Sequence, residues 1–526
     1  MRTFSTLAEV CGSMRIGIVE HRPAPHRRPL TAQDMRFAAA CTVALTLLAH
    51  AYRFLNAGFG LDAMLIAEQV DIETQISLGR FMQPLYWLVR GYITAPPVVA
   101  LFATAFLAGA VLIVLALTGI RSRLGIALTC GVLAVNETLC VSYASYLPWV
   151  DVYMLSLLLC VAAVFVQTRL RRGFLLSPLL YCMALGLYQS YLQAAATLVM
   201  LMLLARALDG ERPGALLVEG LGHAGAMLAG LLLYALVYRL AIALYGTSVS
   251  TEYNTVAEVG HYTLSAIPDL LKKTCWEPIR YFFAPQDATF LPPAVNVLLA
   301  VLALGALIGL AHKLPLASRG LIVLILAMLP FGMNFVTFIS KGIVHMLMNY
   351  AYFFFYVLCI LLAECAGETI AIRPAVLRAA TPMLLAGVMG VSILTAQTLY
   401  MKRDLELQST LSVMTRVLNL LEREEGYEPG ETPVVLLNYL TASKVAMIRP
   451  GFEDISEFQG MRSTYADAYD RSHAWYLQTL LGYRVNLIRW EVCMDYTKDP
   501  ITQDIPAFPD PDCVQMIDGI AFVRLK

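Results

Sequence analysis

VVALFATAFLAGAVLIVLALTG, residues 98–119, contains no charged side chain and decides the class of fold. A helix needs about 20 consecutive apolar residues to cross the hydrocarbon core of a bilayer. Comparable stretches recur from residue 36 to residue 400 of the 526-residue chain. The chain is 58% hydrophobic and 14% charged, whereas soluble domains carry about 25% charged residues. These features predict a multi-pass α-helical membrane protein.

Eleven membrane spans are predicted from the apolar stretches. They cover residues 36–55, 98–119, 124–142, 148–168, 174–187, 189–206, 221–245, 291–312, 318–338, 346–364 and 376–400. The fifth and sixth stretches also allow one long helix, but Tyr188-Gln189-Ser190-Tyr191 favours a short polar turn between two helices. The fifth span is then short.

Basic residues in short loops predict the orientation. They all fall on one side if the N-terminus is cytoplasmic and every predicted span crosses. These residues are Arg27, Arg28, Arg36, Arg121, Arg123, Arg169, Arg171, Arg172, Arg206, Arg212, Lys313, Arg319, Arg373 and Arg378. The segment 56–97, the loops 246–290 and 339–345, and the C-terminal region are then expected outside.

Three regions are predicted along the chain. Residues 1–35 form a polar cytoplasmic arm without the apolar core of a signal peptide. Residues 36–400 form the membrane domain. Residues 401–526 have ordinary soluble polarity and form a small α/β domain, with expected helices at 404–425 and 466–481 and strands at 434–437, 484–490 and 520–525.

Cysteine positions and charge balance bear on cofactors and partners. Cys493 and Cys513 lie in the outer domain, where an oxidising compartment favours a disulfide; two buried thiols are the alternative. No Cys and His spacing resembles a zinc site, so no metal is predicted. Lys+Arg and Asp+Glu number 38 each. The balance gives no basic field for nucleic acid.

Polar residues gather at the expected outer face of the membrane. They are Asp62, Glu68, Asp71, Glu73, Arg80, Asn136, Glu137, Tyr143, Tyr146, Asp151, Gln189, Glu277, Arg280, Lys341, His345 and Asn349. Charges at membrane depth are costly and therefore candidates for function, although an interfacial rim is the alternative. We favour function for Asp62 and Arg80, and the rim for Glu68, Glu73 and Glu137.

Asp62 and Arg80 suggest a specific chemistry. A carboxylate just outside a span can take the proton of an attacking hydroxyl, a step that contributes about 10²–10⁴-fold. An arginine can neutralise a lipid phosphate that leaves, without a metal. The pair therefore favours an enzyme that acts on a lipid-linked substrate, with Asp71 as the rival carboxylate.

The order of a span, Asp62 and then Ser77-Leu78-Gly79-Arg80-Phe81 resembles the opening of the GtrII-type glucosyltransferases. Tyr146-Leu147-Pro148-Trp149-Val150-Asp151 and Gly186-Leu187-Tyr188-Gln189-Ser190-Tyr191 extend the likeness. These enzymes have the GT-C fold class and decorate bacterial O-antigen. The family typically has paired acidic residues where this chain has Leu61-Asp62, so only the second acid is kept.

The resemblance implies an inverting transfer of a sugar, with glucose expected, from undecaprenyl phosphate to a surface polysaccharide. The enzyme would lie in a bacterial inner membrane with its C-terminal domain in the periplasm and would need no cofactor beyond the lipid-linked donor. The expected roles are as follows: Asp62 or Asp71 for catalysis; Arg80, Arg280 and Lys341 for the donor phosphate; and Asp151, Gln189, Tyr143 and His345 for substrate binding. A flippase for lipid-linked sugars and a non-catalytic envelope assembly protein remain alternatives.

Overall fold

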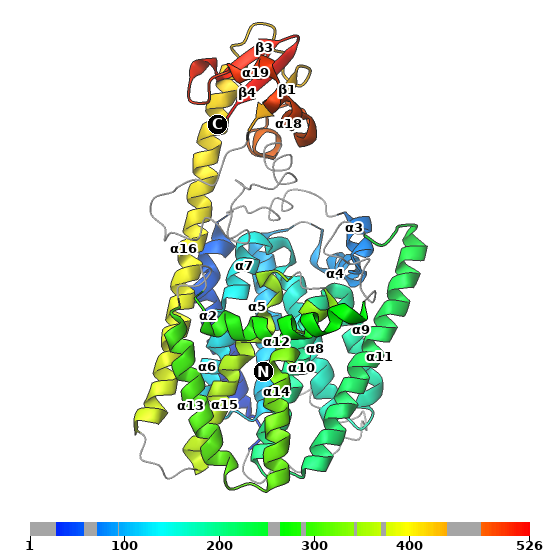
Figure 1. The fold of residues 1–526 in the computed structure, drawn as a ribbon, viewed down its shortest axis with the longest axis vertical. Helices are drawn as coiled ribbons and strands as arrows, with labels where there is room; N and C mark the ends of the chain where they lie inside the picture. The colour runs from blue at the N-terminus through cyan, green and yellow to red at the C-terminus, as the bar shows by residue number, and fades with distance from the viewer. Residues whose placement is uncertain are drawn as a thin grey trace, which may run out of the picture.

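A computed structural model describes residues 28–56, 71–92, 94–250, 263–285, 291–340, 344–369, 375–438 and 475–525. It consists of a helical bundle, one long helix that leaves the bundle, and a small sheet at the far end of that helix (Figure 1). Ten helices of the described residues are long and apolar enough to cross a membrane. The predicted multi-pass helical fold with a small α/β domain is confirmed.

Each of the eleven predicted spans coincides with a helix. The helices are α2 (Ala32–Leu55), α5 (Pro96–Thr118), α6 (Arg123–Ala134) with α7 (Glu137–Ser145), η2 (Leu147–Trp149) with α8 (Val150–Arg169), α9 (Gly173–Leu187), η3 (Gln189–Tyr191) with α10 (Leu192–Leu208), α11 (Pro213–Tyr245), α13 (Pro293–Ala311), α14 (Leu316–Ile339), η7 (Tyr350–Phe353) with α15 (Phe354–Thr369), and α16 (Ala375–Leu421). The predicted break at residues 188–191 separates α9 from α10, and α9, with 15 residues, is the short one.

Local sequence signals set the breaks inside this bundle. Asn136 interrupts the third span and caps α7, because its Oδ1 accepts a hydrogen bond from Leu139 N at 3.1 Å. Asn334 interrupts α14 with non-helical dihedral angles. Its Nδ2 donates to Thr274 O of α12 (Ile267–Phe283) at 3.0 Å. The short helix η5 (Leu264–Ala266) precedes α12, which lies across the bundle (Figure 1).

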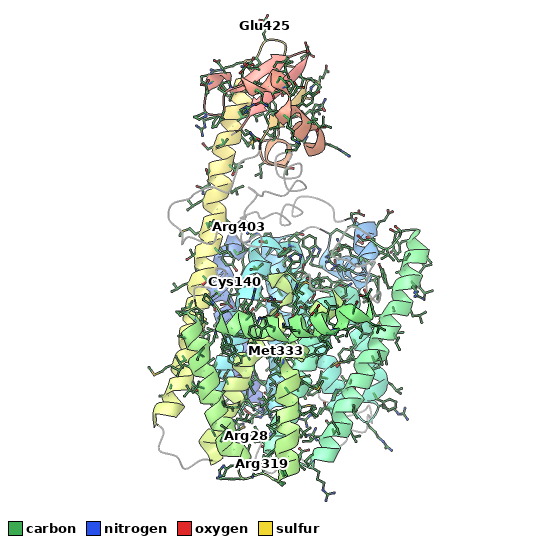
Figure 2. The ribbon with its side chains drawn as sticks, in the orientation of Figure 1. Arg28, Cys140, Arg319, Met333, Arg403 and Glu425 are labelled. Atoms are coloured by element: carbon green, nitrogen blue, oxygen red, sulfur yellow. The ribbon has the colours of Figure 1, made fainter. Side chains whose placement is uncertain are left out.

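Three further short helices complete the bundle. Helices α3 (Ile72–Ser77) and α4 (Met82–Arg90) follow the first span, at the end of the bundle that faces the sheet (Figure 1). Helix η6 (Met346–Met348) precedes η7. The opposite end of the bundle carries Arg28 and Arg319, as Figure 2 shows. Arg28 and Arg319 therefore share one end of the bundle, as expected from the predicted basic loops.

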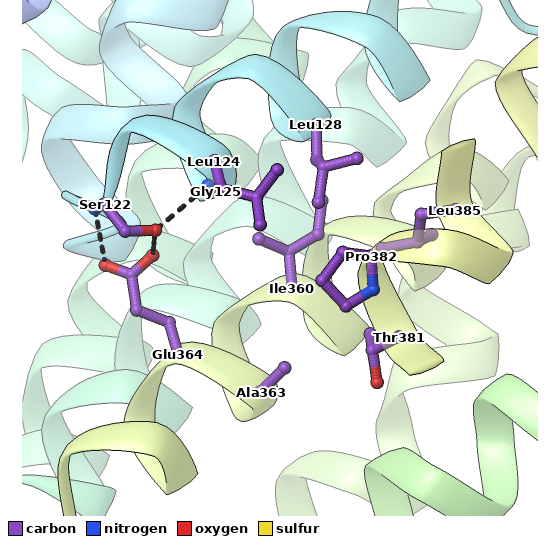
Figure 3. Close-up of a pocket in the computed structure, with 10 residues that line it drawn as sticks. All are labelled: Ser122, Leu124, Gly125, Leu128, Ile360, Ala363, Glu364, Thr381, Pro382 and Leu385. Carbon is purple, nitrogen blue, oxygen red and sulfur yellow. Dashed lines mark hydrogen bonds between the residues drawn. The ribbon is translucent and has the colours of Figure 1, made fainter. Parts of the chain in front are cut away.

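Glu364 of α15 forms hydrogen bonds to the start of α6 at the end of the bundle that carries Arg28 and Arg319. Its Oε1 accepts from Ser122 N at 3.1 Å, and its Oε2 accepts from Ser122 Oγ at 2.7 Å. Ser122 Oγ in turn accepts from Gly125 N and caps α6. Figure 3 shows these bonds beside a small pocket that is otherwise lined mainly by apolar side chains, among them Leu128 and Pro382. We assign Glu364 a structural role.

The C-terminal domain is a four-stranded sheet with strand order β2-β1-β4-β3. Its strands are β1 (Pro433–Leu437), β2 (Asn486–Leu487), β3 (Val514–Ile517) and β4 (Ile520–Arg524). Strand β1 is parallel to β2 and β4, whereas β3 and β4 form an antiparallel hairpin. The remaining elements are η9 (Trp475–Leu480), α18 (Trp490–Lys498), α19 (Pro500–Gln503) and η10 (Pro511–Cys513).

The predicted elements of this domain are partly confirmed. The strands at 434–437 and 520–525 are present, and α16 includes most of the helix expected at 404–425. Residues 484–490 were predicted to be one strand, but only Asn486–Leu487 is a strand and Trp490 begins a helix. Of the helix expected at 466–481, residues 475–480 form a π-helix, and residues 466–474 lie outside the described part.

The disulfide predicted between Cys493 and Cys513 is not formed. Cys493 packs with Val435 and Phe522, whereas Cys513 packs in another cluster with Val434. Successive residues of a strand point to opposite faces of the sheet. The sheet therefore separates the two thiols, and the prediction is wrong because proximity in the sequence said nothing about the face on which each cysteine lies.

Candidate active site at the end of the bundle nearest the C-terminal domain

The acidic segment that motivated the enzyme prediction is only partly described. Asp62, the predicted catalytic base, and Glu68 lie outside the described residues. Asp71 is exposed and caps α3, with Oδ1 accepting from Glu73 N at 2.9 Å and Oδ2 accepting from Thr74 Oγ1 at 2.5 Å. The Thr74 hydrogen bond is the main cause of a lowered pKa at Asp71. Asp71 thus has a structural function whether or not it touches substrate.

The turn between α3 and α4 is tied to α11 and η3. Tyr238 OH donates to Ser77 O at 2.6 Å, and Gln189 Nε2 donates to Leu78 O at 2.9 Å. The same Nε2 lies 2.9 Å from Tyr234 OH. Because these bonds go to main-chain oxygens, they fix the path of the turn. Gln189, a predicted substrate-binding residue, is thereby brought beside the Arg80 segment.

Gly79 is required at the centre of this turn. Its φ is +79°, in the left-handed region where glycine has no steric cost. A Cβ added there would lie 2.1 Å from Tyr234 OH and 3.0 Å from Gln189 Nε2. The next aromatic residue, Phe81, stacks on the Tyr234 ring at 5.6 Å between centroids. The turn therefore packs against α11 more closely than any side chain at residue 79 permits.

Arg80 is held between this turn and the bundle. The residue is 9% exposed, and its Nη1 donates to Gln75 Oε1 at 3.2 Å. The guanidinium carbon lies 5.3 Å from the centroid of the Tyr188 ring. A cation over an aromatic face is stabilised by the ring quadrupole. The structure thus places Arg80 where the turn between α3 and α4 meets the membrane helices. Its phosphate-binding role stays a prediction.

Tyrosine rings continue inward from Arg80. The Tyr188 ring lies 4.4 Å from the Tyr153 ring and 5.9 Å from the Tyr191 ring. The Tyr191 ring lies 5.6 Å from the Tyr350 ring of η7. We name these four residues the tyrosine band. All four side chains are at most 5% exposed, so the band packs as core beside Arg80. Sequence analysis identified none of the four as site residues.

Tyr143, another predicted substrate-binding residue, is fully buried. Its ring lies 4.6 Å from His50 and 5.1 Å from Phe54. Its main-chain oxygen accepts a hydrogen bond from Arg53 Nε at 2.9 Å. The structure therefore places Tyr143 in the core between α2 and α7. A direct contact with substrate stays a prediction.

Asp151 forms a buried ion pair that the sequence did not indicate. Arg90 Nη1 lies 3.0 Å from Asp151 Oδ1, and Tyr86 OH donates to Asp151 Oδ2 at 2.8 Å. Burial, followed by the Asp151 charge, raises the pKa of Tyr86, so this hydroxyl stays protonated and donates. Arg90 was absent from the predicted site. The pair joins α4 to the start of α8, a positioning role, and substrate binding by Asp151 remains untested.

The other predicted site residues come from the later outer segments. Arg280 on α12 is exposed, and its Nε lies 3.4 Å from Glu277 Oε2. Lys341 lies outside the described residues. His345 is half-buried and directly precedes η6. Met346 O of η6 accepts a hydrogen bond from Thr138 Oγ1 of α7 at 2.9 Å. These contacts place His345 near α7, while Arg280 faces away from the core.

Glu73 and Glu137 were both predicted to belong to a solvated interfacial rim, and the outcomes differ. Glu73 is exposed, as the rim interpretation expected. Glu137 is 4% exposed, and its Oε1 accepts from Ser392 Oγ at 3.3 Å. The rim interpretation of Glu137 is therefore wrong: the break at Asn136 turns the start of α7 into the bundle, where α16 covers it. Within the described ranges, no group of three His, Cys, Asp or Glu side chains is placed to hold a metal ion.

The fold and this site define a multi-pass helical membrane protein with polar and aromatic side chains converging at the end of the bundle nearest the C-terminal domain. A family model described as glucosyl transferase GtrII matches residues 54–362, more than half of the chain. The chain therefore belongs to the GtrII glucosyltransferase family. The matched region contains Arg80, Asp151 and Gln189, and it ends before α16. Searches of curated proteins and of solved structures returned no significant match.

Proposed function

We propose that this protein transfers a sugar, with glucose expected, from a polyprenyl phosphate to a polysaccharide at the outer face of a bacterial inner membrane. The observation that carries the proposal is the position of Arg80. This buried cation lies between the outer turn and the tyrosine band, in a chain of the GtrII family. A lipid-linked donor has its phosphate at the membrane surface and its sugar just beyond.

The proposed reaction is a direct displacement. An acceptor hydroxyl oxygen attacks the anomeric carbon and forms the new glycosidic bond. The bond from that carbon to the phosphate oxygen breaks, and polyprenyl phosphate leaves with the electron pair. Asp62 takes the hydroxyl proton as general base. Arg80 stabilises the negative charge that grows on the phosphate. The anomeric configuration is inverted.

Two other features support the placement of substrate in this region. Gln189 and Gly79 hold the turn that carries Arg80, so the cation is fixed before the substrate binds. The buried tyrosine band packs against the Arg80 guanidinium through Tyr188 and holds it in place. Undecaprenyl phosphate and O-antigen are the donor lipid and acceptor that the family resemblance implies.

The test compares surface polysaccharide from cells with the gene, without it, and with an Asp62→Asn variant. We expect mass analysis to find additional hexose only when the unaltered gene is present. Purified protein with a glucosyl polyprenyl phosphate and isolated polysaccharide should reproduce the transfer. A flippase would not form a new glycosidic bond with purified components. Polysaccharide of the same mass in all three strains would contradict the proposal.

A further inference from the structure

Helix α12 lies across the spanning helices instead of along them (Figure 1). Its 17 residues include five charged side chains. Charged side chains are costly at the centre of a bilayer, so α12 is unsuited to crossing the membrane. One side of the helix is packed against the bundle, and the other is exposed among the described residues. The two sides carry different information about where α12 belongs.

The packed side of α12 is fixed to three neighbouring helices. Asn334 Nδ2 of α14 donates to Thr274 O at 3.0 Å. Asn296 Nδ2 of α13 donates to Phe282 O, also at 3.0 Å. The Phe282 ring lies 4.7 Å from the Phe355 ring of α15. Because both amide groups bind main-chain oxygens, they hold α12 at the level of Asn296 and Asn334.

The lengths of α13 and α14 give the depth of that level. Asn296 precedes His312 by 16 residues, and Asn334 follows Arg319 by 15 residues. These intervals correspond to about 24 Å and about 22 Å of helix. His312 and Arg319 are exposed at the end of the bundle that carries the basic loops, and they mark one boundary of the membrane.

The depth is that of a helix lying in a bilayer surface. The hydrocarbon core is about 30 Å thick. An amphipathic helix in the plane of the surface has its apolar face about 5–10 Å inside the boundary of that core. Such a helix would lie about 20–25 Å from the opposite boundary. Both spanning helices therefore place α12 in the bilayer surface nearer the C-terminal domain.

The exposed side of α12 has the side chains that suit this surface. Trp276, Ile279 and Phe283 are 56%, 37% and 38% exposed. Their spacing of three and four residues puts them on one face of the helix. Lys272 and Lys273 are exposed one turn earlier. Tryptophan is enriched at the membrane interface, and basic side chains on an amphipathic helix attract anionic headgroups.

We propose that the exposed side of α12 binds the bilayer surface nearer the C-terminal domain. Trp276 and its apolar neighbours lie among the upper acyl chains, and Lys272 lies at the phosphates of anionic phospholipids. The helix has three basic and two acidic side chains, so its net charge favours anionic lipid over neutral lipid. A second copy of this chain is the competing occupant of the exposed side.

Lipid bound to α12 would also support the candidate site. The Tyr281 ring on the packed side lies 5.3 Å from the Tyr352 ring of η7. The same short helix η7 carries Tyr350 of the tyrosine band. The bilayer surface that holds α12 thereby helps to hold η7 against the bundle.

The experiment measures tryptophan fluorescence of the full-length protein in phosphatidylcholine vesicles that contain brominated lipid, a contact quencher. The chain has five tryptophans, so the signal of Trp276 is the difference between wild type and Trp276→Phe. We expect bromine near the headgroup to quench this signal more strongly than bromine near the chain ends. Both proteins should have the same unfolding temperature, because Trp276 is exposed and phenylalanine keeps an aromatic ring there.

A second series uses brominated phosphatidylglycerol in unbrominated phosphatidylcholine. We expect the anionic lipid to quench Trp276 preferentially. Lys272→Gln should reduce that preference about fivefold, equivalent to about 1 kcal/mol for one basic side chain near an anionic surface. Lys498→Gln is the matched control, because Lys498 is an exposed lysine near the end of α18 in the C-terminal domain. Its preference should equal that of the wild type.

Equal quenching of wild type and Trp276→Phe at every bromine position would overturn the proposal, because Trp276 would then not touch lipid. Stronger quenching from the chain ends would place α12 below the surface and would also overturn it. An unchanged lipid preference in Lys272→Gln would reject the phosphate contact. Quenching of Trp276 that disappears as the protein-to-lipid ratio rises would assign the exposed side to a second copy of the chain.

Discussion

Arg90 Nη1 lies 3.0 Å from Asp151 Oδ1, and the two side chains are 1% and 0% exposed. Arg90 Nη1 also donates to Pro148 O at 2.8 Å. The pair therefore fixes α4, which carries the outer segment, to the start of α8. Removing one partner of such a buried pair destabilises the fold, because the remaining charge is poorly solvated in the protein interior.

Asp151→Asn should destabilise the protein by about 3–5 kcal/mol, the usual cost of breaking a buried ion pair. Denaturant or thermal unfolding in detergent measures it. Arg90→Gln combined with Asp151→Asn should recover part of the loss, since no charge is left unpaired. Glu277→Gln is the control, because it removes an exposed pair worth less than about 1 kcal/mol. Normal stability of Asp151→Asn with lost transfer would instead favour substrate binding by Asp151.

Gly79→Ala should lower both stability and transfer. Alanine at a φ of +79° is strained by about 1–2 kcal/mol, and its Cβ would lie 2.1 Å from Tyr234 OH. Tyr234→Phe in the Gly79→Ala background should restore part of the stability, because it removes the hydroxyl but not the backbone strain. Unfolding and transfer assays check both changes. Gly246→Ala is the matched control, since its φ of +64° is also left-handed but a Cβ there meets nothing within 4 Å. Equal effects of the two alanine variants would show that close packing at residue 79 is unimportant.

The two candidate carboxylates can be separated by their asparagine variants. Asp62→Asn should reduce transfer by at least about 10²-fold with normal expression, if Asp62 is the base. Asp71→Asn should leave both stability and transfer nearly unchanged, because asparagine caps helices about as well as aspartate. Transfer assays and unfolding measurements on the two variants show which carboxylate is the base. Loss of transfer in Asp71→Asn alone would move the catalytic role to Asp71.

The cap at Asp71 also predicts a pH dependence. Its pKa is lowered in the folded protein, mainly by the Thr74 hydrogen bond. Stability from this group is therefore complete above the ordinary aspartate pKa of about 3.9, and it is lost as pH falls through the lowered folded value. The free energy of unfolding, measured from pH 7 to acidic pH, should fall less in Asp71→Asn than in the wild type. An identical acid loss in both proteins would exclude this contribution.

Cys493 and Cys513 should label as two thiols in denatured protein without reductant. Burial on opposite faces of the sheet keeps them apart. Mass analysis of labelled peptides, with and without reductant, measures the pairing. If both peptides are labelled only after reduction, the result would support the disulfide that the sequence suggested.

A reporter that is active only outside the cytoplasm, fused after Lys526, should be active. A second fusion within the loop between α13 and α14, close to Arg319, should be inactive. The expectation comes from the basic loops, and Arg28 and Arg319 lie at the end of the bundle opposite the C-terminal domain. Activity of the inner fusion and silence of the C-terminal one would reverse the orientation and remove the argument for a lipid-linked donor.

The membrane helices were predictable because their signal is local. A spanning helix must be apolar along nearly its whole length and must satisfy its own backbone hydrogen bonds. The short turn at residues 188–191 was also visible as a run of polar and aromatic residues. The end of the last span could not be predicted, because α16 continues from apolar to amphipathic sequence without a helix-ending residue. It supplies Met414 and Val417 to the core of the C-terminal domain.

The sequence by itself determined the class of fold, the place of each long apolar helix and the likeness to GtrII enzymes. Tertiary structure decided which charges meet. Arg90 pairs with Asp151 across 61 residues, and Arg403 reaches Ser145 across 258. Helix packing brings such partners together, and the same packing placed Glu137 inside and parted Cys493 from Cys513. Apolar length is a property of one segment, whereas pairing of buried charges depends on which segments are neighbours in space.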